Sequence, residues 1–525
     1  VICGPMYKSI IFCVCISYVS ANVVRVDAPQ GSFLGETHDG YTTFFGLPYA
    51  RLDSVNPFGV NIYFVLPYFA NDTVMCPQAV YKRSNFLQCL RLNIYVPKVA
   101  SISNKVPILV WFHGGGFAFG SGGEYGGQHL VKRGIIVITV NFRLGPYGFF
   151  CLNERTPGNQ GLKDQIVALK WIKKNIIAFG GNPHLVTIAG ESYGGGAVEL
   201  HLYSEYEKLF DKVIIQSGSI FDEGFYVRPD HRAANKIAKY LGKDYRTVHD
   251  SLKFLTKLDP EIVMSAALNL SLPMAVCKEK RSRSIKNFVT RDPFNLRKTN
   301  KLTRTKIMVG YTNMELLFYY ADQGYKFYED EGDVFYNMLK KNFNMRKKEI
   351  KVVSGVLKQF YLGEKPIGPE TVLELSEAAS DFIINSPTER SIDKMLSLET
   401  DITIYKYVFS YTGGSPYRNI SGAGASHTEE LKYLFEWETP IEDEEQEMMR
   451  KRMTMMWANF VKFGNPTPKV TELLPVTWEP VVGTARPYMN IDVEMSMGDH
   501  IYRRRIAFWD MFWHHYKKHS LVYSP

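Results

Sequence analysis

The sequence lacks several features that would place it outside the ordinary globular proteins. It has no visible internal period, which excludes a repeat array. After the N-terminal region no apolar run approaches the length of a bilayer span, and residues 519–525 form no hydrophobic tail of the kind that precedes a lipid anchor. A Gly/Ser-rich or Pro-rich linker is also missing, so we expect one large domain with long insertions.

A strong charge of one sign is absent as well, since the net formal charge is +9 over 525 residues. The two basic clusters, residues 278–283 and 503–505, contain no interleaved aromatic residues that could stack on bases. We interpret both clusters as solvated loop or helix faces, and we expect no nucleic-acid partner.

The N-terminus has the pattern of a secretory signal peptide. Met6 is followed by Lys8, by an apolar run over residues 10–16, and by small residues at 19–21. This order of zones favours a signal over a buried N-terminal strand, and the run is too short to span a membrane. We therefore expect a secreted protein with a signal peptide over residues 1–21, of which 1–5 are an upstream artefact, and a single domain over 22–525.

Cysteine is scarce, and four cysteines follow the signal: Cys76, Cys89, Cys151 and Cys277. Cys76 and Cys89 are close in sequence and flank a polar loop, which favours a small disulfide loop in a secreted chain. Three triplets of the form Asn-x-Ser/Thr are predicted glycosylation sites: Asn71, Asn269 and Asn419.

The middle of the chain alternates predicted strands and helices. Short apolar runs at 106–112, 135–140, 186–189, 213–215, 307–309 and 402–408 are typical of buried strands. Between them, apolar residues recur at helical spacing over 162–176. Continuous apolar strands separated by helices indicate an α/β fold with a mostly parallel central sheet and helices on both faces.

Two glycine-rich stretches come directly after predicted strands. GESYG, residues 190–194, has the spacing Gly-x-Ser-x-Gly, which holds a serine on a strained turn between a strand and a helix. HGGGF, residues 113–117, allows the N–H groups of Gly115 and Gly116 to converge with that of Tyr193 on one point. Together they predict a nucleophile, Ser192, beside an oxyanion hole.

With these motifs in place, the chain resembles the carboxylesterase/cholinesterase family of α/β-hydrolases from about residue 24 to near its end. The most specific block is PGNQGLKDQ at 157–165, continuing to FGGNP at 179–183. Further blocks are NFRLG at 141–145, QSGS at 216–219 and WANFVKFGNP at 457–466.

The resemblance implies the remaining site residues. The family's acid follows a strand in a Gly-x-x-x-x-Glu-Gly pattern, which Glu315 matches, with Leu316 in place of the final glycine. The family's histidine precedes an acidic pair and a Tyr-Leu-Phe run, which implies His427. By the same resemblance Ser217 supports the acid–histidine pair, and Cys76 pairs with Cys89.

Departures from the family bear on specificity. The family has alanine where this chain has Tyr193, whose ring would stand beside the acyl pocket. The Cys76–Cys89 loop contains no tryptophan to hold a quaternary ammonium, which disfavours a cholinesterase, and Glu191 replaces the glutamine usual in juvenile hormone esterases.

The resemblance implies a secreted serine carboxylesterase of insect type, which hydrolyses neutral, apolar esters through a Ser-His-Glu triad and an acyl-enzyme. Detoxification and the degradation of an odorant or hormone ester are the roles that it implies. Its expected partner is a small-molecule ester, with no metal and no cofactor, and the sequence indicates no oligomeric state. The alternative is a non-catalytic binding or adhesion protein, but such family members have lost triad residues that this chain keeps.

Overall fold

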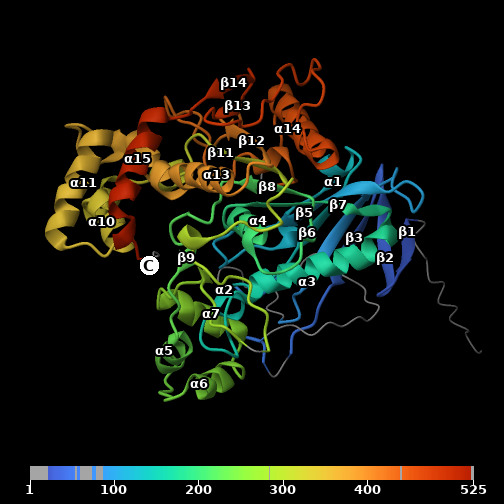
Figure 1. Ribbon diagram of the computed structural model, residues 1–525, viewed down its shortest axis with the longest axis horizontal. Coiled ribbons are helices and arrows are strands. Elements are labelled where there is room, and N and C mark those ends of the chain that lie inside the picture. The colour runs from blue at the N-terminus through green and yellow to red at the C-terminus, as the bar shows by residue number, and fades with distance from the viewer. Residues whose placement is uncertain are drawn as a thin grey trace, which may run out of the picture.

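A twelve-stranded sheet forms the centre of the computed structural model, which describes residues 22–53, 56–59, 74–78, 87–282, 284–437 and 440–521 (Figure 1). Its strand order is β1-β2-β3-β4-β6-β5-β7-β8-β11-β12-β13-β14. The strands are β1 Val23–Ala28, β2 Gly31–His38, β3 Tyr41–Pro48, β4 Arg91–Pro97, β5 Val106–Phe112, β6 Ile136–Val140, β7 Gly181–Glu191, β8 Lys212–Gln216, β11 Lys306–Thr312, β12 Thr403–Phe409, β13 Pro487–Ile491 and β14 Ser496–Asp499, with β9 Tyr226–Val227 and β10 Val276–Cys277 pairing separately.

The central part of the sheet is parallel, as the alternation of strands and helices predicts. Strands β6, β5, β7, β8, β11, β12 and β13 pair in parallel, while β1 to β4 and β14 add antiparallel edges. Strands β5, β6, β7 and β8 are almost wholly buried because helices cover both faces, which explains their continuous apolar runs. The predicted α/β class with a mostly parallel sheet is confirmed.

Helices cover both sides of the sheet. On one side α3 and α4 pack in a core with Ile166 and Val198, and on the other side α14 packs through Met456 and Trp457. The helices are α1 Gln128–Val131, α2 Gly145–Phe149, α3 Gln160–Asn175, α4 Tyr193–Tyr203, α5 Ala233–Tyr240, α6 Val248–Leu255, α7 Pro260–Asn269, α8 Leu317–Tyr320, α9 Tyr325–Glu331, α10 Val334–Asn342, α11 Lys347–Tyr361, α12 Val372–Ser380, α13 Ser386–Leu398, α14 Glu444–Phe463 and α15 Arg503–Tyr516. Among the described residues, none of them is long and apolar enough to cross a membrane.

Two groups of helices stand away from the sheet, each with its own apolar core. Helices α10, α11, α12 and α15 pack together around Leu357 and Trp509, and α5, α6 and α7 pack around Ile237 and Leu255 (Figure 1). In the chain, α5 to α7 lie between β8 and β11, α10 to α12 lie between β11 and β12, and α15 follows β14.

Two disulfides connect the loops. The expected Cys76–Cys89 bond is present, and a second bond joins Cys151 to Cys277, a pairing that the sequence did not predict because 126 residues separate the two cysteines. The predicted signal peptide and the predicted glycosylation site Asn71 lie outside the described residues. Asn269 and Asn419 are exposed, and their glycosylation stays a prediction.

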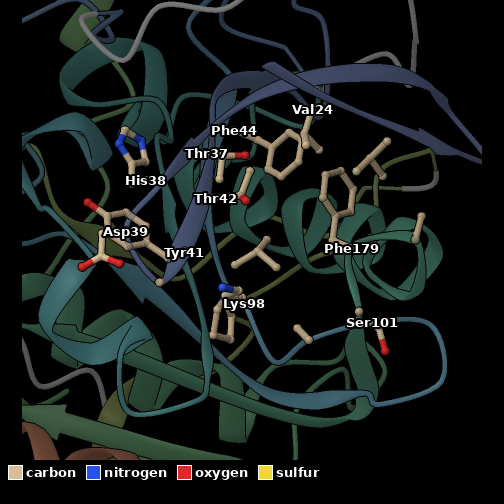
Figure 2. Close-up of a pocket in the computed structure, with 17 residues that line it drawn as sticks. Val24, Thr37, His38, Asp39, Tyr41, Thr42, Phe44, Lys98, Ser101 and Phe179 are labelled. Carbon is tan, nitrogen blue, oxygen red and sulfur yellow. The ribbon is translucent and has the colours of Figure 1, made fainter. Parts of the chain in front are cut away.

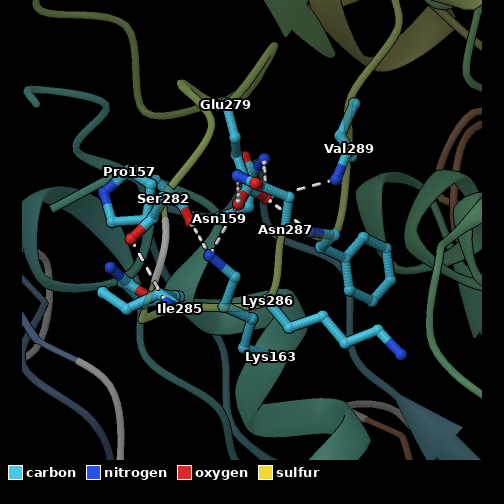
Figure 3. A network of polar contacts seen from close by, with 12 residues as sticks. Pro157, Asn159, Lys163, Glu279, Ser282, Ile285, Lys286, Asn287 and Val289 are labelled. Atoms are coloured by element: carbon cyan, nitrogen blue, oxygen red, sulfur yellow. Dashed lines mark hydrogen bonds and ion pairs between the residues drawn. The ribbon is translucent and has the colours of Figure 1, made fainter. Parts of the chain in front are cut away.

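A buried polar network joins the start of α3 to the loop around Glu279 (Figure 3), and Asn159, a member of this network, also hydrogen-bonds the backbone of Cys277. The Nζ of Lys163, in α3, donates to Glu279 Oε2 over 2.7 Å, and both side chains are almost fully buried. Glu279 also accepts from the Asn159 and Asn287 side chains and from two backbone N–H groups, those of residues 288 and 289. Because each buried charge has partners, the network satisfies the condition under which a buried ion pair is tolerated.

Candidate active site

Ser192 occupies the turn between β7 and α4 with φ 56° and ψ −130°, a conformation that is costly for a residue with a side chain. The neighbouring glycines allow the turn. A Cβ at Gly190 would lie 2.5 Å from Gly194, and a Cβ at Gly194 would lie 2.2 Å from the Phe112 carbonyl oxygen. The strained strand–helix turn that the spacing predicts is therefore present.

Glu315 and His427 form a close pair at the same end of the sheet. His427 Nδ1 lies 2.6 Å from Glu315 Oε2, while Oε1 accepts hydrogen bonds from the Ser217 hydroxyl at 2.6 Å and the Thr312 N–H at 2.7 Å. The Glu315 side chain is completely buried. A carboxylate fixed in this way holds the proton of a neutral imidazole on Nδ1 and leaves Nε2 free to accept one.

The other ring nitrogen faces a second carboxylate. His427 Nε2 lies 3.0 Å from Oε1 of Glu191, the residue before Ser192, and among the described residues the Ser192 hydroxyl makes no hydrogen bond. Burial alone would lower the pKa of His427, but the Glu191 and Glu315 carboxylates outweigh it and hold the pKa well above its ordinary value. Burial raises the pKa of Glu191, which the imidazole partly offsets. The histidine therefore sits between two carboxylates that favour its protonated form.

The glycine loop after β5 packs against the serine turn. A Cβ at Gly114 would lie 3.1 Å from Ser192 Cβ, and Gly115 and Gly116 have φ values of +92° and +60°. Among the described residues, no backbone carbonyl accepts from the N–H groups of Gly115, Gly116 or Tyr193. A Cβ at Gly116 would meet nothing within 4 Å, so the loop borders open space. The loop thus carries free donors next to the serine.

The Tyr193 ring points into an aromatic cluster and a cavity. Its centroid lies 5.1 Å from that of Phe117 and 5.3 Å from that of Phe225, both edge to face. Burial, with Asp222 and Glu223 nearby, raises the pKa of its hydroxyl. Tyr193 lines a cavity of about 490 Å³ with mostly apolar walls. These walls come from α8, α9, α10 and α12 and from residues next to them, among them Leu316, Tyr320, Phe327, Phe335, Met338 and Phe382.

A second cavity, of about 660 Å³, reaches His427. Phe119, Phe318 and Trp437 line it, together with residues 414–419. The predicted glycosylation site Asn419 is one of its lining residues. A third cavity, of about 360 Å³, lies between β1, β2, β3 and residues 178–180, and none of the predicted site residues line it (Figure 2). Of these three cavities, the first is lined by Tyr193, the neighbour of Ser192, and the second by His427.

The structure places Glu315, His427 and Ser217 in contact and Gly114 against Ser192, while His427 Nε2 contacts Glu191 and not the Ser192 hydroxyl, so Glu191 is a residue that the sequence did not predict. Glu191 was noted in the sequence only as a departure from a related group, because nothing in a strand's alternation shows that its last side chain will reach the histidine. Its position directly before Ser192 was the available signal. Among the described residues no cluster of three or more His, Cys, Asp or Glu side chains could hold a metal ion.

Comparison of the whole chain with known proteins finds esterases. A family model described as "Carboxylesterase family" matches residues 70–509. Esterase FE4 of Myzus persicae is 29% identical over 522 residues, covering 91% of each chain. Juvenile hormone esterase of Tribolium castaneum is 28% identical, covering 88% of this chain and 87% of its own. The crystal structure of juvenile hormone esterase from Manduca sexta, with OTFP covalently attached, superposes with a TM-score of 0.79 at 24% identity, covering 94% of this chain and all of its own, which supports the fold.

Proposed function

The chain belongs to the carboxylesterase family of carboxylic ester hydrolases, and from this premise we propose that it is a secreted serine carboxylesterase acting on neutral, apolar esters. The observation that carries the proposal is the contact between the buried Glu315 and the half-buried His427, whose imidazole also contacts Glu191, the residue before Ser192. The two disulfides support secretion, because such bonds persist in oxidising compartments.

The proposed reaction begins with proton transfer. His427 Nε2, once turned from Glu191 toward Ser192, takes the hydroxyl proton while Nδ1 keeps its bond to Glu315. Hydrogen bonds of this kind are often unformed before substrate binds. The serine oxygen then attacks the ester carbonyl, and the N–H groups of Gly115, Gly116 and Tyr193 bind the negative oxygen. Each such donor lowers the barrier by roughly 3 kcal/mol.

The second half of the reaction frees the enzyme. His427 returns the proton to the departing alcohol, which leaves Ser192 acylated. Water then attacks the acyl group, gives its proton to His427, and the carboxylic acid departs as the serine regains its hydrogen.

The substrate preference rests on the cavity that Tyr193 lines. Its walls are mostly aromatic and aliphatic side chains, which favour an apolar group over a charged one. Tyr193 contributes its backbone N–H to the proposed oxyanion hole and its ring to the cavity wall, so we propose that its ring limits the size of the acyl group.

Labelling with a fluorophosphonate tests the proposal. We expect an adduct on Ser192, located by mass spectrometry, and its loss in Ser192→Ala and His427→Ala. The replacement Ser204→Ala, a buried serine at the far end of α4, is the matched control and should label normally. Absence of labelling in folded protein would reject the enzyme and favour the alternative of a secreted binding or adhesion protein.

A further inference from the structure

Helix α11 carries an apolar stripe that the fold does not use. Ile350, Val353 and Leu357 are buried in the helical core, as expected for an amphipathic helix. A second set, Val352, Val356 and Phe360, recurs every four residues on another side and is 64%, 53% and 41% exposed. The exposed side of a surface helix normally carries polar side chains, so the apolar side chains here point to a partner outside the molecule.

The stripe continues onto α15, which lies beside α11 at one end of the molecule (Figure 1). The ring of Phe360 stacks on that of Phe508, with centroids 4.3 Å apart. Met511, less than one helical turn further along α15, is 67% exposed. We call the exposed side chains of α11 and α15 the α11–α15 surface.

Positive charge is concentrated on α11, on α15 and on the segments that flank them, which include the end of α10. Residues 340–365 carry eight Lys or Arg and two Glu, and residues 503–518 carry five Lys or Arg and one Asp. The resulting net charges of +6 and +4 together exceed the +9 of the whole chain, so the rest of the protein is nearly neutral. Among the described residues, ion pairs engage Lys365 and Arg505, but none engages the exposed side chains of Lys348, Lys351 or Arg504.

We propose that the α11–α15 surface docks onto an anionic lipid surface. Val352, Val356 and Phe360 would enter the headgroup region while the surrounding lysines and arginines meet the lipid phosphates and carboxylates. Helices that lie in a lipid interface combine an apolar stripe with basic flanks in this way, and the attraction of each cation to an anionic bilayer adds to the binding.

Two other kinds of partner, a polyanion and a second copy of the chain, fit the α11–α15 surface less well. A nucleic acid or a sulfated polysaccharide would use the cations but leave the apolar stripe in water. A second copy of the chain would bring two strongly positive surfaces together, which repel each other. An anionic lipid surface satisfies both features, and it would bring a lipid-borne molecule to the helices α10 and α12 that line the Tyr193 cavity.

Sedimentation of the full-length protein with vesicles tests the docking directly. We expect at least about tenfold tighter binding to vesicles containing 30% phosphatidylserine in phosphatidylcholine than to phosphatidylcholine alone. The replacement Lys348→Gln/Lys351→Gln/Lys358→Gln should weaken binding to the anionic vesicles roughly 100-fold, because each cation near such a bilayer strengthens binding about fivefold. The triple replacement of Val352, Val356 and Phe360 by serine should weaken it by a similar factor.

Matched controls come from elsewhere on the surface. Lys278→Gln/Lys280→Gln/Arg281→Gln removes the same charge from an exposed cluster, and Val99→Ser/Ile102→Ser/Val482→Ser removes exposed apolar side chains away from α11. Each should change vesicle binding less than about threefold. All of the replaced side chains are at least partly exposed, and unchanged thermal unfolding of the variants would show that they fold.

Several results would overturn the proposal. Equal binding to both kinds of vesicle, or equal weakening by the control variants, would remove the role of the α11–α15 surface. Binding to heparin but not to vesicles would identify a polyanion as the partner. If the wild-type protein binds no vesicles and is a dimer in sedimentation equilibrium, and the triple serine variant is a monomer, the partner of this surface is a second copy of the chain. None of these measurements depends on ester hydrolysis, so the docking and the proposed activity can fail separately.

Discussion

Replacing Glu315 by glutamine should remove most esterase activity although the side chain keeps its shape. Oε1 of Glu315 accepts from both the Ser217 hydroxyl and the Thr312 N–H, so the amide oxygen will take that place. The amide NH₂ then faces His427 Nδ1, which must accept a hydrogen bond instead of donating one. The imidazole proton moves to Nε2, and that nitrogen can no longer take the proton of Ser192.

The magnitude follows from this forced change of tautomer. Turning the glutamine amide over would leave the buried Thr312 N–H without an acceptor, at a cost of about 1–3 kcal/mol. The amide NH₂ therefore stays directed at His427 Nδ1. Loss of the correct tautomer in a Ser-His-acid site lowers kcat by about 10⁴-fold. That factor corresponds to about 5 kcal/mol in the barrier.

Hydrolysis of p-nitrophenyl acetate at pH 7 measures the effect, with Glu430→Gln as the matched control. Glu430 is a buried carboxyl near the site, and burial together with Glu191 and Glu315 raises its pKa to about 8. It is therefore mostly protonated at pH 7, and its replacement by a neutral amide should change kcat/KM less than about tenfold. A Glu315→Gln variant within tenfold of the wild type would refute the assigned role of Glu315.

Three further predictions follow from particular contacts. Glu191→Gln removes a carboxylate that stabilises the imidazolium and should therefore lower the pKa of His427. Because the neutral imidazole is the proposed base, the acid limb of the pH profile of kcat/KM should move to lower pH. An acid limb at the same pH as in the wild type would contradict the Glu191–His427 contact. Lys163→Met should lower the free energy of unfolding, measured by urea titration, by about 3 kcal/mol. Glu279→Leu should lower it more, because the leucine leaves the lysine charge and four other hydrogen-bond donors without their acceptor. A larger loss in Lys163→Met than in Glu279→Leu would contradict the network. Tyr193→Ala should raise kcat/KM for long-chain p-nitrophenyl esters more than for the acetate, whereas equal changes would remove its role in acyl selection.

Much of the candidate site could be predicted because its backbone depends on short-range constraints. The strand–turn–helix at Ser192 and the glycine loop at 113–117 each lie within a few residues of sequence, where sterics allow few conformations. The α/β order was readable for a similar reason, since buried parallel strands must be continuously apolar. Glu315 and His427 were identified through resemblance, because a lone carboxylate or histidine in a loop carries no local signal of its partner.

Other features depend on which distant segments the fold brings together. The approach of Glu191 to His427, the Cys151–Cys277 bond and the network around Glu279 join residues more than 100 positions apart, and no local pattern encodes such meetings. The basic cluster at 503–505 shows the same limit. Its composition alone indicates a solvated helix face. The contact of α15 with α11 places it beside the exposed apolar side chains of Val352, Val356 and Phe360. Residue order dictates the chemistry of each local segment, whereas long-range packing selects which of these chemistries act together.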